Sequence, residues 1–456
     1  MRFFAFLAAL CLTGAAHAAS TGVGLLFNGG TAPLAPGYYV ATTGSDSNPG
    51  TLAQPFLTLG KAQTAMQSGL KITYLRAGTY APGSAGTGCG DSQGAVLLLT
   101  SSDNGETWSY YPPDGYGSAV IDGGASGNSG VGWGICSSAD NLVVNGLKFT
   151  NFQVSGITST GSTPLIENNT IDGITNTVRA TYEIGTTCAL NGQIVHNVLL
   201  NSTEFGIGIF PNSAGCADNV VVSNNYGQNL CTAQYDCAGV YIENNLGEPE
   251  TGQVVEYNYM TDLYAGAGGN GYYVDDGGSN VTLTLNVARP GGTDNYPCLN
   301  LHGGSNNVIT GMICDLTVDS GKQIMVITNS SGTPTGNSFT ESLILASSSG
   351  SNVGGGYPCN ASPCGTTTIG PNGYLNTVGS SILATGSAGN DSNPQQQIAV
   401  TFTCGWEYTL PGGSPAYSSP VNFPTQPAGW GNAGFWGPPG FTIPRTSTVP
   451  SIPHTC

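Results

Sequence analysis

Residues 143–151 read VVNGLKFTN, a short run of strand-forming residues that Asn145 and Gly146 interrupt near its middle. Side chains alternate between the two faces of a β-strand, and Asn and Gly favour the turns that end it. The same pattern recurs along the chain with a period of roughly 25–30 residues, which is typical of stacked structural repeats. The further copies are LIENNTIDG (165–173), QIVHNVLLN (193–201), VVVSNNYGQ (220–228), QVVEYNYMT (253–261), VTLTLNVAR (281–289) and VITGMICDL (308–316).

A second short strand follows in most of these repeats, and no helical periodicity separates the two. Repeats of this kind cannot bury an apolar face alone, so they stack into a solenoid. The second strands are FGIGIF (205–210), GVYIEN (239–244), GYYVDDG (271–277), CLNLHGG (298–304) and IMVITN (324–329). The sequence therefore predicts an all-β solenoid.

The segment YYVATTGSDSNPGTLAQPFLTLGKAQTAM (38–66) precedes the repeats and supplies a strand, a turn and a short helix at residues 59–66. Together with the repeats, it resembles the secreted right-handed parallel β-helix proteins of the pectate-lyase-like superfamily. The resemblance implies a right-handed parallel β-helix with a short N-terminal capping helix and an irregular C-terminal flank. It leaves the function open, because the superfamily includes lyases, hydrolases, esterases and non-catalytic adhesins.

Three segments are expected along the chain. Residues 1–18 have the basic, apolar and small-residue parts of a secretory signal peptide. Residues 19–345 carry the repeats and form the predicted β-helix domain. Residues 346–456 contain many Gly, Pro and aromatic residues together with further cysteines. Pro and Gly are expected to prevent regular rungs there, so this segment is predicted to be a disulfide-containing cap or flank.

The composition favours an extracellular or periplasmic monomer that binds neither nucleic acid nor membrane. Nine scattered basic residues stand against 26 acidic ones, whereas nucleic-acid binding needs clustered Lys and Arg. No segment after residue 18 is long and apolar enough to span a bilayer. Of 13 cysteines, Cys11 lies in the signal, which leaves an even number for disulfides. The short-range candidate pairs are Cys231–Cys237, Cys298–Cys314 and Cys359–Cys364.

The second strands can be aligned on their apolar residues, which predicts two outward columns on three consecutive rungs. Rungs lie about 4.8 Å apart, and the side chains between inward positions point outward. The inward residues are Ile207, Ile209, Val240, Ile242, Tyr272, Val274, Leu299 and Leu301. One outward column is Glu243, Asp275 and His302, and the other is Tyr241, Tyr273 and Asn300.

The first column is a candidate catalytic site, because only 8% of the residues are charged. Two carboxylates at this spacing disfavour joint ionisation, so the pKa of one should rise and separate an acid from a base. We predict Asp275 as nucleophile and Glu243 as acid/base catalyst, with His302 tuning Asp275 or binding a sugar hydroxyl. Asp276 and Asp236 complete the predicted catalytic set, Asp236 reaching the column from a loop.

The second column supplies the predicted substrate-binding residues Tyr241, Tyr273 and Asn300, since aromatic and amide side chains suit sugar rings and hydroxyls. A structural alternative stays open for the acidic residues. Residues 275–278 read DDGG and would then simply form a turn with an Asx hydrogen bond. In contrast, Asn169, Asn197, Asn225 and Asn258 recur at turns and are predicted to form a structural amide ladder.

Three classes of function fit these features. A glycoside hydrolase needs two carboxyl groups and no cofactor, and adjacent rungs predict the separation of about 5–5.5 Å that gives retention of configuration. A polysaccharide lyase, by resemblance to the superfamily, would use Ca²⁺ bound by carboxylates and a Lys or Arg base. The column contains no Lys or Arg, and an acidic surface repels polyanions. The third class is a non-catalytic glycan-binding solenoid or adhesin. The sequence favours a hydrolase acting on a neutral or weakly acidic polysaccharide.

Overall fold

The computed structural model describes residues 33–81, 93–124, 131–174, 176, 181–211, 213, 215–233, 236–243, 251–263, 269–290, 297–317, 323–328, 333–346, 365–376, 391–396, 402–403, 408–410, 412–428, 430, 435–443 and 454–455. The chain divides into two compact units, Met1–Pro36 and Gly37–Cys456. The predicted signal peptide, residues 1–18, lies outside the described residues. No helix in the described ranges has the length and apolar character needed to cross a membrane.

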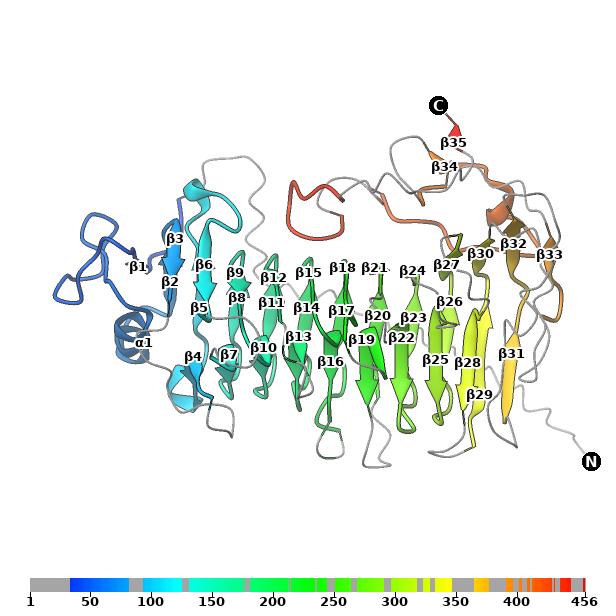
Figure 1. Ribbon diagram of the computed structural model, residues 1–456, viewed down its shortest axis with the longest axis horizontal. Helices are drawn as coiled ribbons and strands as arrows, with labels where there is room; N and C mark the ends of the chain where they lie inside the picture. The colour runs from blue at the N-terminus through cyan, green and yellow to red at the C-terminus, as the bar shows by residue number, and fades with distance from the viewer. Residues whose placement is uncertain are drawn as a thin grey trace, which may run out of the picture. The chain divides into compact units, whose positions relative to one another are not determined.

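Three parallel sheets form the second unit (Figure 1). The first has twelve strands, β1 (Tyr38–Val40), β2 (Ile72–Leu75), β5 (Thr107–Tyr110), β8 (Val143–Asn145), β11 (Leu165–Glu167), β14 (Gln193–Val195), β17 (Val221–Ser223), β20 (Val254–Glu256), β23 (Thr282–Thr284), β26 (Val308–Thr310), β29 (Thr335–Thr340) and β31 (Thr366–Ile369). The second has nine strands, β4 (Ala95–Leu99), β7 (Trp133–Ser137), β10 (Ser155–Ser159), β13 (Tyr182–Thr186), β16 (Phe205–Ile209), β19 (Cys237–Glu243), β22 (Gly269–Asp275), β25 (Leu299–His302) and β28 (Met325–Thr328). The third has twelve, β3 (Gly78–Tyr80), β6 (Ala119–Asp122), β9 (Lys148–Thr150), β12 (Thr170–Asp172), β15 (Val198–Leu200), β18 (Tyr226–Gln228), β21 (Tyr259–Thr261), β24 (Val287–Arg289), β27 (Ile313–Leu316), β30 (Leu343–Ala346), β32 (Gly373–Asn376) and β33 (Gln395–Gln396).

Each strand pairs with the strand one repeat away, which is the topology of a parallel β-helix. In the nine-stranded sheet, Ile207 pairs with Val240, Val240 with Tyr272, and Tyr272 with Leu299. All four side chains are buried in the core. The inward columns predicted from the alternation of apolar residues are therefore confirmed.

The predicted amide ladder is confirmed at the turn between the first and third sheets. The backbone N–H of Asn169 donates to Asn197 Oδ1 at 3.0 Å, and that of Asn197 donates to Asn225 Oδ1 at 2.9 Å. Asn225 N–H bonds to Asn258 Oδ1, and Asn258 N–H to Asn286 Oδ1, each at 3.0 Å. The ladder is fully buried, so each amide satisfies backbone groups that water cannot reach.

The first rungs carry one α-helix, α1 (Leu59–Ser68), which extends two residues beyond the predicted range. Thr58 caps it by accepting a hydrogen bond from the backbone N–H of Lys61. Its buried residues Leu59, Ala62 and Met66 face the core. Short 3₁₀ helices occur at η1 (Ser101–Asp103), η2 (Pro112–Asp114) and η4 (Pro415–Tyr417).

Parallel pairing continues past residue 345, where Pro and Gly were expected to prevent it. Strands β31, β32 and β33 extend the first and third sheets as far as Gln396. The expectation of no regular rungs is wrong for residues 366–376 and 395–396, because Pro371 lies between strands β31 and β32. Asn372 Oδ1 accepts from the Ser342 N–H at 2.9 Å and so repeats the ladder contact.

The later C-terminal residues lie against the outer side of the third sheet (Figure 1). Trp430 and Trp436 pack in one apolar cluster with Tyr259 of β21. The Tyr408 hydroxyl donates to Asp315 Oδ2 at 2.5 Å. A two-stranded pair, β34 (Phe402–Thr403) and β35 (His454–Thr455), completes the described strands.

Two of the predicted disulfides are present, Cys231–Cys237 and Cys298–Cys314. A third, Cys188–Cys216, joins the turns of two adjacent rungs and was not predicted. Its cysteines lie 28 residues apart, so no short spacing marks them as a pair. The predicted Cys359–Cys364 pair falls outside the described residues.

Candidate active site on the nine-stranded sheet

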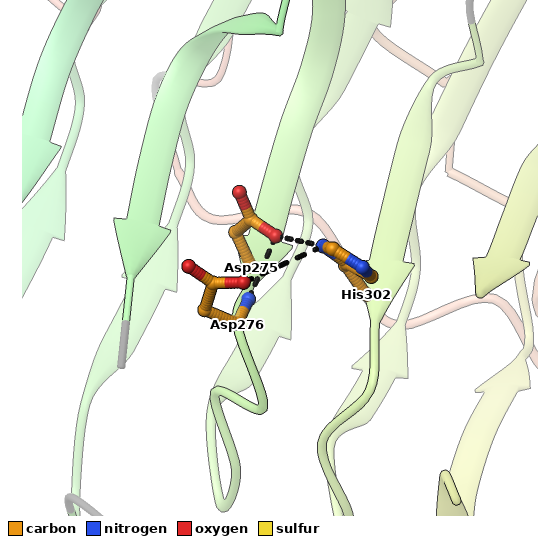
Figure 2. A group of neighbouring side chains, drawn as sticks. All are labelled: Asp275, Asp276 and His302. Carbon is orange, nitrogen blue, oxygen red and sulfur yellow. Dashed lines mark hydrogen bonds and ion pairs between the residues drawn. The ribbon is translucent and has the colours of Figure 1, made fainter. Parts of the chain in front are cut away.

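The outward columns predicted from the sequence are brought together on strands β19, β22 and β25. Glu243 pairs with Asp275, Tyr241 pairs with Tyr273, and Tyr273 pairs with Asn300. Asp275 and His302 end their strands side by side, as Figure 2 shows. The predicted register is therefore confirmed, and the roles of these residues remain predictions.

Asp275 is the buried centre of the cluster, with 3% of its surface exposed. The Tyr241 hydroxyl donates to its Oδ2 at 2.5 Å, and the backbone N–H of Asp276 donates to its Oδ1 at 2.7 Å. His302 Nδ1 also contacts Oδ1. Burial alone would raise the pKa of Asp275, but the hydrogen bonds from His302 and Tyr241 hold it below its ordinary value. Asp275 is thus an ionised carboxylate in a poorly hydrated place.

His302 is the hydrogen-bond partner of this carboxylate on the next rung. The hydrogen bond to Asp275 raises the pKa of His302, and burial only partly opposes that effect. Asp276 Oδ1 lies 3.8 Å from the same Nδ1 (Figure 2). The Tyr273 hydroxyl lies 3.5 Å from it.

The turn that formed the structural alternative is also present. Gly278 N–H donates to the Asp275 carbonyl at 2.9 Å, and Gly277 has a φ of 86°, a conformation that glycine adopts at little cost. Asp276 has a φ of 45°, which is uncommon for a residue other than glycine. The turn directs both carboxylates toward His302, so the turn and the ionic cluster occur together.

The pKa of Glu243 is shifted in the opposite direction to that of Asp275, its neighbour on the next strand. Its side chain is half-buried and has no described basic partner. Burial, together with the charges of Asp276 and Asp275, raises the pKa of Glu243 to about 7. One rung therefore carries a carboxyl whose pKa is raised to about 7, and the next carries a carboxyl whose pKa is lowered.

Asp236 approaches the cluster from the segment before β19, as the sequence predicted. It is exposed and lies near enough to Asp275 for the two charges to interact. Partial burial of its carboxyl and the Asp275 charge raise the pKa of Asp236.

The predicted substrate-binding residues differ in their exposure. Tyr241 and Tyr273 are each 6% exposed, and their ring centroids lie 5.2 Å apart in an edge-to-face arrangement. Tyr241 also contacts Phe205, with ring centroids 4.2 Å apart. Asn300 is only half-buried. Among these three residues, Asn300 has the side chain most open to solvent.

Glu204 was missed by the sequence analysis. It directly precedes β16, is 9% exposed, and accepts a hydrogen bond from the Thr181 N–H at 2.6 Å. Burial and the nearby Asp236 charge raise the pKa of Glu204 to about 7. In the sequence, Glu204 could have been noticed as a carboxyl residue one rung before the predicted column. It lies just before the strand segment that was aligned, and so it was not included.

The described cations lie elsewhere. None of the nine strands of this sheet contains Lys or Arg. Arg76 pairs with Asp114, Lys148 with Asp172, and Arg289 with Asp315 on other parts of the unit. Arg179 and Lys322 fall outside the described residues. His302 is therefore the basic group that the described part of the site provides.

Asp275, Asp276 and His302 place ligand atoms within 4.8 Å of one another, so the group was tested as a metal site. Ca²⁺ takes six to eight oxygen ligands, whereas this set offers two carboxylates and an imidazole nitrogen. Both Asp275 oxygens already accept hydrogen bonds, and His302 Nδ1 contacts one of them. The donor set does not fit the Ca²⁺ that the lyase alternative requires.

Comparisons with known proteins identify similar folds. No protein-family model matches the sequence, and no curated protein matches it. A GH136 lacto-N-biosidase from Eubacterium ramulus is 13% identical with a TM-score of 0.51, over 78% of this chain and 66% of that enzyme. The A-module of the mannuronan C-5 epimerase AlgE6 from Azotobacter vinelandii is 13% identical with a TM-score of 0.49, over 73% of this chain and 91% of the module.

The pectate lyase Pel9A is 14% identical with a TM-score of 0.47, over 75% of this chain and 80% of that enzyme. This chain spans slightly less than two thirds of the length of the lacto-N-biosidase. At these identities the likeness concerns the fold. The chain has the right-handed parallel β-helix fold found in carbohydrate-active proteins, as the sequence predicted.

Proposed function

We propose that this protein is a secreted polysaccharide-active enzyme, a glycoside hydrolase whose two principal carboxyl groups are Glu243 and Asp275. The observation that carries the proposal is their pairing on adjacent strands in environments that separate their protonation states. Glycoside hydrolysis requires one carboxylic acid and one carboxylate beside the scissile bond. A pair of carboxyls whose pKa values are pushed apart suits that division of roles.

Glu243 is the general acid in this proposal. With a pKa raised to about 7, it keeps its proton at weakly acidic pH and can deliver it to the glycosidic oxygen. Its half-buried side chain leaves it accessible to a substrate on the outer face of β19. Once the leaving group has departed, the Glu243 carboxylate takes a proton from the water that attacks the sugar bonded to Asp275; this step breaks the bond to Asp275 and restores the acid.

Asp275 supplies the negative charge opposite the sugar carbon where positive charge develops. His302 and Tyr241 keep this carboxylate ionised and fix its orientation. A charge held in place by such preorganised partners stabilises a transition state without needing to reorganise. Asp275 lies on the strand next to Glu243, and carboxyl groups this close are expected to give a retaining reaction. In such a reaction, Asp275 forms a bond to the sugar.

The substrate is proposed to be a neutral glycan. Uronate carboxylates would meet Glu243, Asp236 and Asp276 with no described Lys or Arg to neutralise them. This charge distribution, together with the poor fit of the Asp/His cluster to Ca²⁺, places the lyase second. Three described disulfides support an oxidising compartment and thus secretion.

A substrate panel tests the proposal by two parallel readouts, the release of reducing ends and the absorbance of unsaturated products. We expect reducing ends without absorbance on a neutral polysaccharide, with the product anomer followed by NMR to determine stereochemistry. Absorbance that a chelator abolishes would establish the lyase instead. Binding without either signal would favour a non-catalytic solenoid.

A further inference from the structure

Two partly exposed aromatic side chains lie on the outer face of the nine-stranded sheet, Tyr182 at the start of β13 and Phe210 directly after β16. Their ring centroids are 5.4 Å apart. Ile209 pairs with Ile242, so Phe210 occupies the rung before Glu243 in the same outward column. The two rings therefore form one surface that begins one rung from the proposed general acid.

Ring contacts connect this surface to the candidate site. The ring centroid of Phe210 lies 5.8 Å from that of Tyr241. Phe205, which is 5% exposed, contacts both rings, with centroids 6.0 Å from Phe210 and 4.2 Å from Tyr241. The Tyr241 hydroxyl in turn donates to Asp275. A ligand held at Glu243 and Asp275 thus has an aromatic surface next to it along the sheet.

Two glycines allow the rings to lie against the strands. Gly185 pairs with Gly208, and Gly208 pairs with Tyr241, whose side chain faces outward. A Cβ at Gly208 would lie 2.3 Å from Cε2 of Phe210, and one at Gly185 would lie 2.1 Å from Cε2 of Tyr182. Each ring occupies the space over a glycine, close to the strand backbone. The exposed part of each ring is therefore turned away from the sheet.

The third sheet also carries aromatic residues on its outer face, but there the chain itself covers them. Tyr259 packs with Trp430 and Trp436 of the C-terminal residues, and all three are at most 3% exposed. In the described part of the chain, this cluster includes no side chain of the nine-stranded sheet. Phe210 thus keeps the exposure that Tyr259 loses.

The surroundings of the two rings favour a neutral sugar as their ligand. Thr160 and Thr187 precede Phe210 in its outward column and offer hydroxyl groups. Glu183, the one charged residue of strands β7, β10, β13 and β16, is fully buried. A pyranose ring has a face of C–H groups that can pack on the negative face of an aromatic ring, while its hydroxyls bond to polar groups. Aromatic rings bordered by hydroxyls rather than charges suit this chemistry.

We propose that Phe210, with Tyr182 beside it, forms a sugar-binding subsite for a neutral glycan whose scissile bond lies at Glu243 and Asp275. The link to bond cleavage rests on the proposed function, whereas glycan binding at the rings does not. The glycan then runs across the strands from β19 toward β13. Longer oligosaccharides should therefore bind more tightly than disaccharides.

Calorimetry on the Glu243→Gln background tests binding without cleavage, with neutral gluco- and xylo-oligosaccharides from disaccharides to hexasaccharides as probes. Phe210→Ala should weaken the binding of the longer probes about tenfold, as for the loss of one aromatic contact. Phe210→Leu should weaken it similarly because it keeps an apolar side chain but no ring, and Phe210→Tyr should retain it. Phe441→Ala, which removes a partly buried ring from the outer face of the third sheet, should leave binding unchanged.

Gly208→Ala provides a second route that leaves both rings in the chain. Its Cβ would displace the Phe210 ring, which is the movable end of a side chain, so the variant should fold, as thermal unfolding will show. We expect it to weaken glycan binding when Phe210 is present and to have no effect in Phe210→Ala, because both changes act on the same contact.

The outcomes separate this subsite from the proposed function. On a cleaved glycan, Phe210→Ala should raise KM with little change in kcat, since the contact holds substrate and transition state alike. A glycan that binds through Phe210 but is not cleaved would contradict the proposed function alone. Wild-type affinity and KM in Phe210→Ala, or equal losses in Phe210→Ala and Phe441→Ala, would overturn the subsite. Binding of peptides or phosphatidylcholine vesicles in place of every neutral oligosaccharide would overturn it as well.

Discussion

One outward position of the nine-stranded sheet can be followed from rung to rung, and its chemistry changes along the sheet. In order, the residues there are Thr160, Thr187, Phe210, Glu243, Asp275, His302 and Thr328. The threonines at the early rungs are neutral, and Thr160 Oγ1 bonds to the Ser137 carbonyl of the preceding rung at 3.3 Å. The backbone pairing is the same on both sides of this change.

The difference shows that the β-helix does not require charge at this position. At Thr160, the side-chain hydroxyl donates a hydrogen bond to a carbonyl of the preceding rung, and the residue stays exposed to solvent. Asp275, in contrast, is buried and depends on side chains from both adjacent rungs, Tyr241 and His302. Burying a charge costs free energy unless partners compensate it, so Asp275 needs these partners, whereas the hydroxyl rungs need none.

The largest difference between a charged rung and a hydroxyl rung is expected at Glu243. Glu243→Gln keeps the size of the side chain but removes the acidic proton, so hydrolysis should slow by about 10²–10⁴-fold. Thr160→Ala, at the matched position three rungs earlier, should leave kcat and KM unchanged. Both are measured as reducing-end release on the same substrate. Equal activity of Glu243→Gln and wild type would remove Glu243 from the mechanism.

Asp275→Asn tests whether the buried charge is the centre of the cluster. We expect an activity loss of about 10²-fold or more, because the preorganised negative charge is removed. The pKa of His302 should fall toward its ordinary value, since its hydrogen bond to Asp275 is the main cause of the shift. NMR titration of His302 reports this change separately from activity. A His302 pKa that stays raised would contradict the ion pair.

His302→Gln should produce a smaller, pH-dependent loss of stability. The raised pKa of His302 stabilises the fold below the ordinary histidine value, and that contribution is lost as pH rises through the folded-state pKa. The lowered pKa of Asp275 stabilises it above the ordinary aspartate value and is lost as pH falls through the folded-state pKa.

The His302 contribution is therefore largest between about pH 4 and 6.5. Thermal unfolding should show a Tm lower by about 1–2 °C at pH 5 for this partly exposed pair. At pH 9 the difference from wild type should nearly vanish. A deficit that grows with pH would reverse the sign of the argument.

The smallest expected effect comes from placing charge on a neutral rung. Thr160→Glu introduces a carboxylate at an exposed position of the same column, and its free energy of unfolding should change by less than about 0.5 kcal/mol. It should neither alter activity nor shift the pKa of His302, because it lies three rungs before Glu243. Chemical denaturation and the same NMR titration measure both outcomes. A strong loss of stability would show that the fold requires the hydroxyl at this rung.

Much of the fold could be read from local periodicity. Alternation in the second strands predicted that Val240 and Tyr272 face inward and that Glu243 lies beside Asp275, because side-chain direction in a strand has a period of two. The recurring Asn169 and Asn197 predicted the buried ladder for the same reason, since each repeat returns the same residue to the same turn. The disulfide between Cys231 and Cys237 followed from short spacing.

Other features could not be read in this way. Glu204 precedes its strand, and only the stacking of turn segments brings it near Asp236. The Cys188–Cys216 pair and the contact of Tyr408 with Asp315 join residues that have no common local pattern. The strands at residues 366–369 and 373–376 were not predicted, because the sequence does not show that Pro371 falls between strands.

The sequence by itself determined the repeat, the inward columns and the adjacency of Glu243 and Asp275, because these depend on neighbours one rung apart and on the alternation of a strand. Only the tertiary structure decided the protonation of those two carboxyls. Their pKa values depend on burial and on the distances to Tyr241 and His302, which the direction of a side chain leaves undetermined. The pKa values of two neighbouring acidic residues are thus shifted in opposite directions by the side chains that surround each of them.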